Sequence, residues 1–257
     1  MHYFINRIDE ELIEYLRNKK GKVHSVFKRS FNIMFDRIIN INMNGDYTDS
    51  FGMNMDNQSF IIDKGDVVYC GDNTIIIKDK NIIFDYSYAE KVDLHIRKIE
   101  KKEIEKLQKN LKGFISAIES NTDLDINFIA KITGIYEFYK FLKFLIGNGK
   151  GLTPSGDDFI MGYILGLNIL GIKHMANEQL RILMNKTNII SRTKIMDIIN
   201  FKSNSIIKDI IYSLRSDEDI NIYKNIYKIT SYGSTSGYDF LLGLSCSLNN
   251  NYNSNIN

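Results

Sequence analysis

The hydrophobic period of the chain changes once, and this change limits the fold more than any other feature. Up to about Tyr88, short runs rich in β-branched and aromatic residues alternate with turn-like stretches such as DKGD, CGDN and KDKN. From about Arg97, apolar residues recur at the three- and four-residue spacing of helices. The pattern predicts an α+β protein with a β-rich domain over 1–96, an α-helical domain over 97–248 and a disordered, asparagine-rich tail over 249–257.

The β-rich part contains six candidate strands, at residues 22–27, 37–44, 58–63, 66–70, 73–78 and 81–86. They follow one another too closely for crossover helices between them. The sheet should therefore be mainly antiparallel, and a small barrel is one form that it can take. This part has no cluster of acids, hydroxyls and glycines, so we expect it to cover a site or to bind partner subunits.

The rear of the chain has the pattern of a helical domain. Helices are expected over residues 96–119, 126–147, from Pro154 onward, 177–187, 191–201, 205–215, 222–233 and 240–248.

The composition is that of an ordinary globular protein. The chain has 257 residues, 44% hydrophobic content and a net charge of +2, so no strong field directs it to nucleic acid. The first twenty residues carry acids in a helical pattern rather than a signal peptide, and no apolar run is long enough to span a bilayer. Cys70 and Cys246 form neither a CxxC motif nor a disulfide framework, which favours a reducing, cytoplasmic location.

The single proline of the chain lies in GNGKGLTPSGDDFIMGYILG, residues 147–166. Proline suits the first position of a helix, which makes Thr153 the expected N-cap, although Ser155 with Asp158 also fits a capping box. Gly162 and Gly166 each cost about 1 kcal/mol inside a helix relative to alanine. We expect the close approach of another backbone to compensate for this cost.

The glycines before this helix suggest an anion site. Backbone amides at a helix N-terminus, the positive charge of Lys150 and the nearby hydroxyls are suited to binding an anion. The spacing fits neither a Walker A loop nor a dinucleotide fingerprint. A well-capped helix after a flexible loop is an equally good interpretation of this stretch taken alone.

A second copy of the motif occurs in GSTSGYDFLLGL, residues 233–244. The copies share a threonine, a serine-glycine pair, an aspartate and a later glycine: Thr153, Ser155, Gly156, Asp158 and Gly162, and then Thr235, Ser236, Gly237, Asp239 and Gly243. The repetition predicts two helix N-termini that meet around one site, with Asp158 and Asp239 as a carboxylate pair. Asp157 has no counterpart, because Tyr238 takes its place.

Several chemical roles remain open for these carboxylates. They can bind a metal, act as acid or base, or accept hydrogen bonds from an amide. The four histidines form no ligand-spaced cluster, so we expect no resident metal or other cofactor, and magnesium only as a companion of a phosphate substrate. Ser155 and Ser236 lack an evident histidine base, and Cys246 has the surroundings of a core residue rather than of a nucleophile.

At these residues the sequence resembles the AllH family, which is associated with oxamate carbamoyltransferase. GKGLTPSGDDFIMGYILGL is similar to the family's first signature and GSTSGYDFLLGL to its second. GKVHSVFKRSFNIMF resembles the N-terminal opening of the family and TNIISRTKI its middle segment, so the likeness covers most of the chain. The middle segment implies that Thr187, Ser191 and Arg192 lie near the site.

The resemblance implies a subunit that acts with AllF-like (FdrA-like) and AllG-like proteins in anaerobic purine and allantoin breakdown. The implied reaction converts oxalurate and phosphate into oxamate and carbamoyl phosphate, or the reverse. Asp157, Asp158 and Asp239 are then the catalytic candidates. The substrate-binding candidates are Gly149, Lys150, Gly151, Thr153, Ser155, Gly156, Ser191, Arg192, Thr235, Ser236 and Gly237. A non-catalytic anion-binding or assembly subunit is the alternative.

Overall fold

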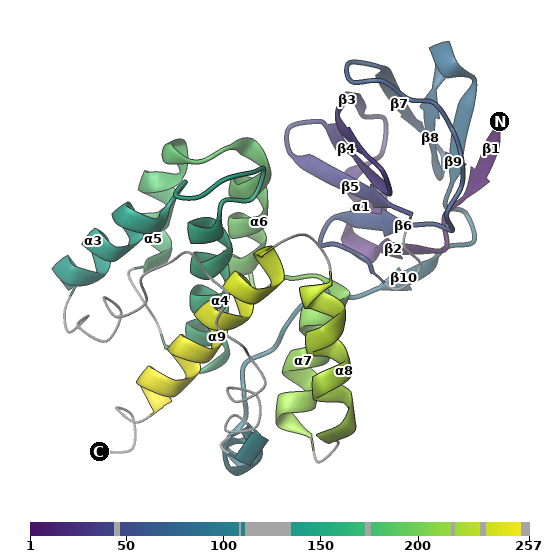
Figure 1. Ribbon diagram of the computed structural model, residues 1–257. Coiled ribbons are helices and arrows are strands. Elements are labelled where there is room, and N and C mark those ends of the chain that lie inside the picture. The colour runs from purple at the N-terminus through teal and green to yellow at the C-terminus, as the bar shows by residue number, and fades with distance from the viewer. Residues whose placement is uncertain are drawn as a thin grey trace. The chain divides into compact units, whose positions relative to one another are not determined.

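The computed structural model divides into two compact units, Met1–Leu94 and His95–Asn257 (Figure 1). It describes residues 1–43, 47–107, 109–110, 135–172, 176–216, 219–231 and 235–252. The first unit is built on a sheet and the second is mostly helical, so the predicted α+β class is confirmed.

The first unit is a curled, mixed sheet of ten strands in the order β1-β9-β8-β7-β3-β4-β5-β6-β2-β10 (Figure 1). The strands are β1 His2–Phe4, β2 Arg7–Asp9, β3 Lys20–Phe27, β4 Ser30–Met34, β5 Ile38–Asn42, β6 Gly52–Asn54, β7 Val67–Gly71, β8 Thr74–Ile77, β9 Ile82–Asp85 and β10 Glu90–Val92. A short helix, α1 (Glu10–Tyr15), follows β2. The β1–β9, β2–β10 and β5–β6 pairs are parallel and the other pairs of the sheet are antiparallel, so the sheet is mainly antiparallel, as expected.

The sequence pattern located only part of this sheet. Five of the six candidate segments overlap β3, β5, β7, β8 and β9, but residues 58–63 form no strand. The pattern missed β4 and four three-residue strands, β1, β2, β6 and β10. A three-residue strand is too short to display an alternating pattern, because the side-chain period of a strand is two residues.

Aromatic rings fill the concave side of the sheet. Phe31 and Phe84 are fully buried with ring centroids 5.4 Å apart, and Phe60 packs edge-on against both of them. Each buried aromatic ring removes a large apolar area from water, so this cluster holds β4, β9 and the segment that carries Phe60 together.

The second unit packs its helices around α4. The helices are α3 Ile135–Leu145, α4 Ser155–Ile169, α5 Ala176–Leu183, α6 Ile189–Ile199, α7 Ser205–Arg215, α8 Asp219–Thr230 and α9 Ser236–Tyr252. Every residue of α4 from Gly156 to Ile169 is buried, which identifies it as the central helix. Most of the helix expected over 96–119, and the first part of that expected over 126–147, lie outside the described residues.

The last helix is longer than the pattern indicated. It was expected over 240–248, but α9 begins at Ser236 and continues to Tyr252. The first four residues assigned to the disordered tail are therefore helical, and 253–257 lie outside the described residues.

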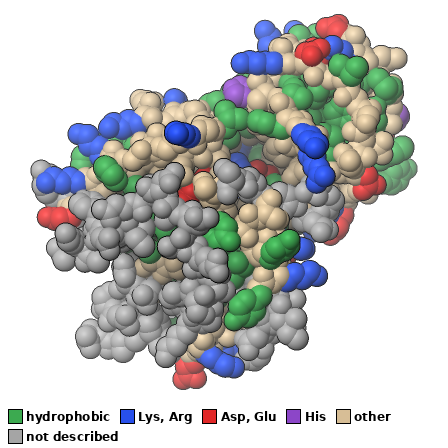
Figure 2. All heavy atoms as spheres, viewed as in Figure 1, with side chains coloured by type: hydrophobic (Ala, Val, Ile, Leu, Met, Phe, Trp, Pro, Cys, Tyr) green, Lys and Arg blue, Asp and Glu red, His purple; other side chains and the backbone are tan. Residues whose placement is uncertain are grey.

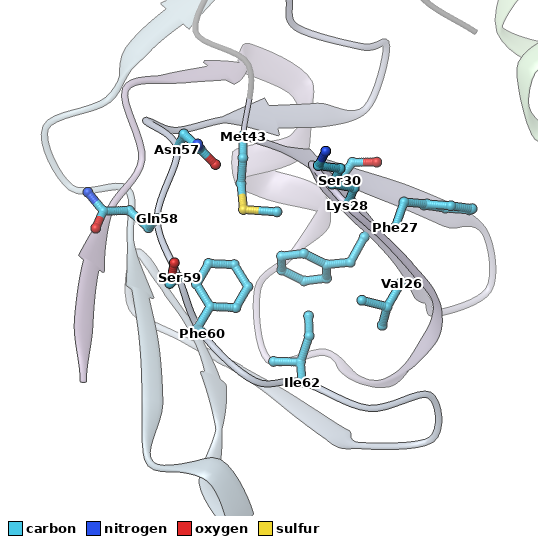
Figure 3. A pocket seen from close by; sticks show the side chains of 11 residues that line it. Val26, Phe27, Lys28, Ser30, Met43, Asn57, Gln58, Ser59, Phe60 and Ile62 are labelled. Carbon is cyan, nitrogen blue, oxygen red and sulfur yellow. The ribbon is translucent and has the colours of Figure 1, made fainter. Parts of the chain in front are cut away.

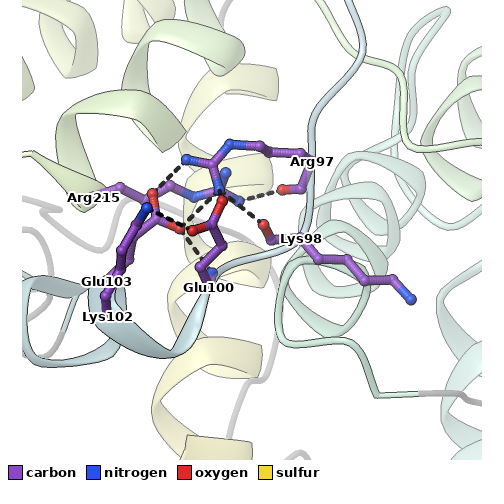
Figure 4. Close-up of polar contacts among 6 residues, drawn as sticks. All are labelled: Arg97, Lys98, Glu100, Lys102, Glu103 and Arg215. Atoms are coloured by element: carbon purple, nitrogen blue, oxygen red, sulfur yellow. Dashed lines mark hydrogen bonds and ion pairs between the residues drawn. The ribbon is translucent and has the colours of Figure 1, made fainter.

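A polar cluster fixes the start of the second unit (Figure 4). The guanidinium of Arg97 donates two hydrogen bonds to Glu103, at 2.8 and 2.5 Å, and lowers the pKa of that carboxyl to about 2. Arg215, at the end of α7, donates to the Arg97 carbonyl. The side chain of Glu103 also accepts from the Glu100 backbone, so the cluster ties residues 97–103 to α7 and has a structural role.

Charged side chains are dispersed rather than gathered. On the face shown in Figure 2, the Lys and Arg side chains are spread among neutral and acidic ones. No helix within the described residues is both long enough and apolar enough to cross a membrane.

Candidate functional site at the paired turns

The two copies of the repeated motif meet in space. The Thr153 and Ser236 hydroxyls lie 3.0 Å apart, and those of Ser155 and Thr235 lie 3.4 Å apart. In each contact the threonine of one turn faces the serine of the other. The arrangement is therefore reciprocal, as in two parts related by an approximate twofold axis, and the predicted meeting of the two turns is confirmed.

Glycines bring α4 and α9 into backbone contact below the turns. A β-carbon on Gly162 would lie 1.9 Å from the Phe240 carbonyl oxygen, and one on Gly243 would lie 2.0 Å from that of Phe159. Further along, Gly166 faces the side chain of Ser247. The contacts advance in the same direction along both helices, so α4 and α9 are parallel and their positive dipole ends lie at the same place.

The repeat extends to the helices that precede the turns. A β-carbon on Gly156 would lie 2.0 Å from the carbonyl oxygen of Leu145, the last residue of α3. One on Gly237 would lie 2.3 Å from that of Ile229, near the end of α8. Both glycines let a new helix start against the end of the previous one, so α3–turn–α4 and α8–turn–α9 are equivalent structural units.

The cap of α4 differs from the prediction. Pro154 is the N-cap with φ −55° and ψ 142°, Ser155 is the first helical residue, and no side chain caps this end. Thr153 is not the N-cap, because its hydroxyl bonds across to Ser236 instead. The Pro154 carbonyl accepts from the Asp157 and Asp158 amides, and the Gly156 amide donates to Asn148.

These bonds leave fewer backbone amides free to bind an anion at the start of α4 than the sequence suggested. Three amides of the first turn, those of Gly156, Asp157 and Asp158, already have acceptors within the protein. Hydroxyl and carboxyl side chains are consequently the main polar groups that this end of α4 offers to a ligand.

Asp157 holds the glycine-rich loop in place. Its carboxylate accepts from the Gly147 amide at 2.7 Å and from the Thr187 hydroxyl, and its side chain is fully buried. Gly147 adopts φ +74°, a left-handed conformation that favours glycine. Asp157 thus links the loop after α3 to the segment before α6.

Asp158 lies deeper between the helices. It is 4% exposed, and its Oδ2 is buried without a hydrogen-bond partner among the described residues. Burial raises its pKa to about 8, against the opposing effects of a hydrogen bond from Ser236 and the charge of Lys194. The negative charges of Asp239 and Asp157 also contribute to this raised pKa, which favours the protonated form of the carboxyl.

The start of α6 completes the surroundings. Its N-cap is Asn188, which accepts from the Ile190 and Ser191 amides and donates to the Leu152 carbonyl at 2.9 Å. Ser191 is buried, and its Oγ has no hydrogen-bond partner among the described residues. Arg192 donates through Nε to the Thr187 carbonyl at 3.0 Å.

Comparison with known proteins identifies the family. Residues 145–248 match the family model for oxamate carbamoyltransferase subunit AllH, and residues 4–91 match the model for the AllH family N-terminal domain. The chain belongs to the AllH family. Searches of curated proteins and of solved structures found no match. The AllH match at 145–248 contains both turns and α6.

The structure brings the candidate residues of this AllH protein together to different degrees. The four hydroxyl residues of the turns are in direct contact, and Asp158 is linked to the second turn through Ser236. Asp239 is fully buried in the first turn of α9, and Gly237 packs against α8. Gly149, Lys150 and Gly151 are exposed on the loop, and both glycines have positive φ, +123° and +94°.

Sequence reasoning missed one charged residue of this region. Lys194 on α6 interacts electrostatically with Asp158. Its position one helical turn after Ser191, itself expected near the site, is the signal that could have identified it.

Other reactive groups have unsuitable surroundings. Burial raises the pKa of Cys246 to about 11, which leaves its thiol protonated and weakly nucleophilic. Within the described residues, no group of three or more His, Cys, Asp or Glu side chains is placed to hold a metal ion.

Proposed function

We propose that this AllH protein is a subunit of an oxamate carbamoyltransferase and that the paired turns form its substrate site. The observation that carries the proposal is the reciprocal contact between the turns, with the Ser236 hydroxyl of the second turn against the buried carboxyl of Asp158 in the first. The family match supports the reaction class. The pathway, anaerobic purine and allantoin breakdown, is part of the proposal.

The protonated state of Asp158 suits the chemistry. In the forward direction, a phosphate oxygen attacks the ureido carbonyl carbon of oxalurate, and the bond from that carbon to the oxamate nitrogen breaks. The departing nitrogen takes up a proton, and hydrogen phosphate loses one. Asp158 donates the first proton and is restored by the second, directly or through Asp239, so the step consumes no net proton.

The charges around the turns suit anionic substrates. Oxalurate, oxamate and phosphate are all anions, and two parallel helices present their positive ends here. Lys150 on the loop and Lys194 and Arg192 on α6 are the cationic side chains assigned to binding. The hydroxyls of Thr153, Ser155, Thr235 and Ser236 supply donors for the developing charge on the carbonyl oxygen.

A non-catalytic role is the second candidate. It is favoured by the internal bonds of the α4 amides and by the burial of the Asp158 Oδ2. In that case the carboxyls fix the two helices, and the AllF-like (FdrA-like) or AllG-like subunits supply the reacting groups.

The deciding experiment compares Asp158→Asn with wild type in the complex assembled with AllF-like and AllG-like subunits. The rate of carbamoyl phosphate formation from oxalurate and phosphate should fall about 100-fold or more, because the proton donor is lost. Asp79→Asn, in the first unit, is the matched control and should retain the wild-type rate. Wild-type turnover by a folded Asp158→Asn complex would leave the second candidate.

A further inference from the structure

The first unit contains a pocket of its own (Figure 3). Its volume is about 240 Å³, and eleven residues line it, from the β3–β4 hairpin, β4, Met43 and the segment 57–62. Of the lining residues, Phe31, Met43 and Ile62 are buried, whereas Val26 and Phe27 are 43% and 40% exposed. Pockets for cofactors and drug-sized ligands usually measure about 300–1,000 Å³, so this one suits a single large side chain better.

The pocket adjoins an incomplete part of the sheet. On the side away from β4, β3 pairs with β7 only over Lys20–Lys22, and one further pair of bonds joins Val23 to Gly65 and Asp66. Beyond that point no described strand pairs with residues 24–27 on this side. The pocket lies between the end of β3 and residues 57–62, which both contribute to its lining (Figure 3).

The facing segment has the composition of a strand without being one. Residues 58–63, QSFIID, have strand propensity, yet the structure assigns them no strand. Ile61 is 76% exposed there. Unpaired strand edges next to a pocket are sites at which an extended segment of another protein adds to a sheet, with backbone bonds for affinity and a side chain in the pocket for specificity.

We propose that an extended, acidic segment of a partner subunit pairs with the free end of β3 and places one large side chain in this pocket. The inference rests on the proposed function to the extent that the chain is a subunit of a complex. The choice of partner follows from charge. Lys28 is the only charged residue among the eleven that line the pocket, and the adjacent Arg29 is also basic and exposed. A carboxylate in the incoming segment would lie against this end of the hairpin.

Assembly with purified AllF-like and AllG-like subunits tests the proposal. Val26→Glu places a negative charge on the pocket wall, and Lys28→Glu reverses the charge at its edge. Each should weaken assembly at least 10-fold in sedimentation or titration measurements. The matched controls are Tyr88→Glu and Lys91→Glu, which alter exposed residues outside the lining and outside the facing segment and should assemble as wild type. Circular dichroism of each variant establishes that it is folded.

Hydrogen exchange gives an independent measurement. The amides of residues 24–27 should exchange more slowly in the complex than in the chain alone. If the wild-type complex forms without this protection and with full tolerance of Val26→Glu, the docking proposal is wrong and the proposed function stands. If the wild-type chain assembles with neither subunit, both fail. Protection in the isolated chain that rises with its concentration would identify a second copy as the occupant and overturn the choice of partner.

Discussion

The hydroxyl groups of Thr153 and Ser236 lie 3.0 Å apart, although 83 positions separate them in the sequence. Ser236 also forms a hydrogen bond with the buried carboxyl of Asp158. One hydroxyl of the second turn thus contacts two residues of the first motif, Thr153 and Asp158. This chain of polar contacts is the part of the molecule on which single substitutions should act most clearly.

Ser236→Ala should lower transfer activity and shift its pH dependence. The lost donor costs about 1–3 kcal/mol of transition-state stabilisation, which is roughly 5- to 150-fold in kcat/KM. Because the Ser236 hydrogen bond opposes the rise of the Asp158 pKa, its removal should move that pKa, and the alkaline limb of the rate profile, above the wild-type position. Ser155→Ala, whose hydroxyl faces Thr235, should reduce the rate with a smaller shift. Unchanged pH profiles in both would contradict the assignment of Asp158 as the titrating acid.

The stability of the protein should depend on pH through the titration of Asp158. Its pKa is raised from about 3.9 in an unfolded chain to about 8 in the folded protein. The folded state therefore binds more protons between these values, and its stability falls as the pH rises through this window. Asp158→Asn removes that dependence, so its Tm relative to wild type should increase from pH 5 to pH 9. A difference in Tm that is the same at both pH values would show that the carboxyl does not titrate in this range.

Gly→Ala substitutions where α4 crosses α9 should lower the stability of the protein, although alanine has the higher helix propensity. Gly→Ala normally stabilises a helix by about 1 kcal/mol, but at Gly162 the new methyl would meet the Phe240 backbone and should destabilise the protein by several kcal/mol. At Gly166 the obstacle is the Ser247 hydroxyl. Adding Ser247→Ala should therefore restore part of the Tm lost in Gly166→Ala and none of that lost in Gly162→Ala. Denaturant unfolding of the single and double variants measures both effects.

Thr187→Val should loosen the loop after α3. The change removes one of two donors to the buried Asp157 carboxylate at nearly constant volume, and should cost about 1–3 kcal/mol. Combined with Asp157→Asn, its effect should be smaller than when made alone, because the shared hydrogen bond is already altered. Strictly additive losses of stability would show that the two side chains do not interact. Thr193→Val, in α6, is a control that leaves this bond intact.

The sequence predicts the meeting of the two turns more fully than it predicts the sheet. The matched Thr-Ser-Gly-x-Asp-Phe residues predicted the meeting of the two turns because the same hydroxyl, glycine and acidic residues recur at the start of two apolar helices, and this repetition is visible in sequence. The reciprocal pairing of Thr153 with Ser236 was not predictable, because it depends on the crossing geometry of α4 and α9. From the sequence, Pro154 can be either the N-cap or the first helical residue. In the structure Pro154 is the N-cap, and the Thr153 hydroxyl contacts Ser236 of the other turn instead of capping α4.

The strands of the sheet also depend on pairing with neighbouring strands, which the periodicity of the sequence does not reveal. Residues 58–63 have the composition of a strand, but a strand also needs a neighbour, and none is present among the described residues. Conversely β6, Gly52–Asn54, is a strand because it lies between β5 and β2, although its composition is poor for one. Lys194 likewise acts on Asp158 through the packing of α6 rather than through any motif.

The two equivalent halves of the helical unit are joined in a single polypeptide, and this has a consequence that identical subunits could not share. A symmetric homodimer carries every substitution twice, once on each side of its axis. Here Asp157 stands on one side and Tyr238 on the other, and Asp157 ties the first turn to a glycine-rich loop. The covalent joining lets the two similar turns diverge separately, so under the proposed function a substrate lying across both turns would meet chemically different groups at its two ends.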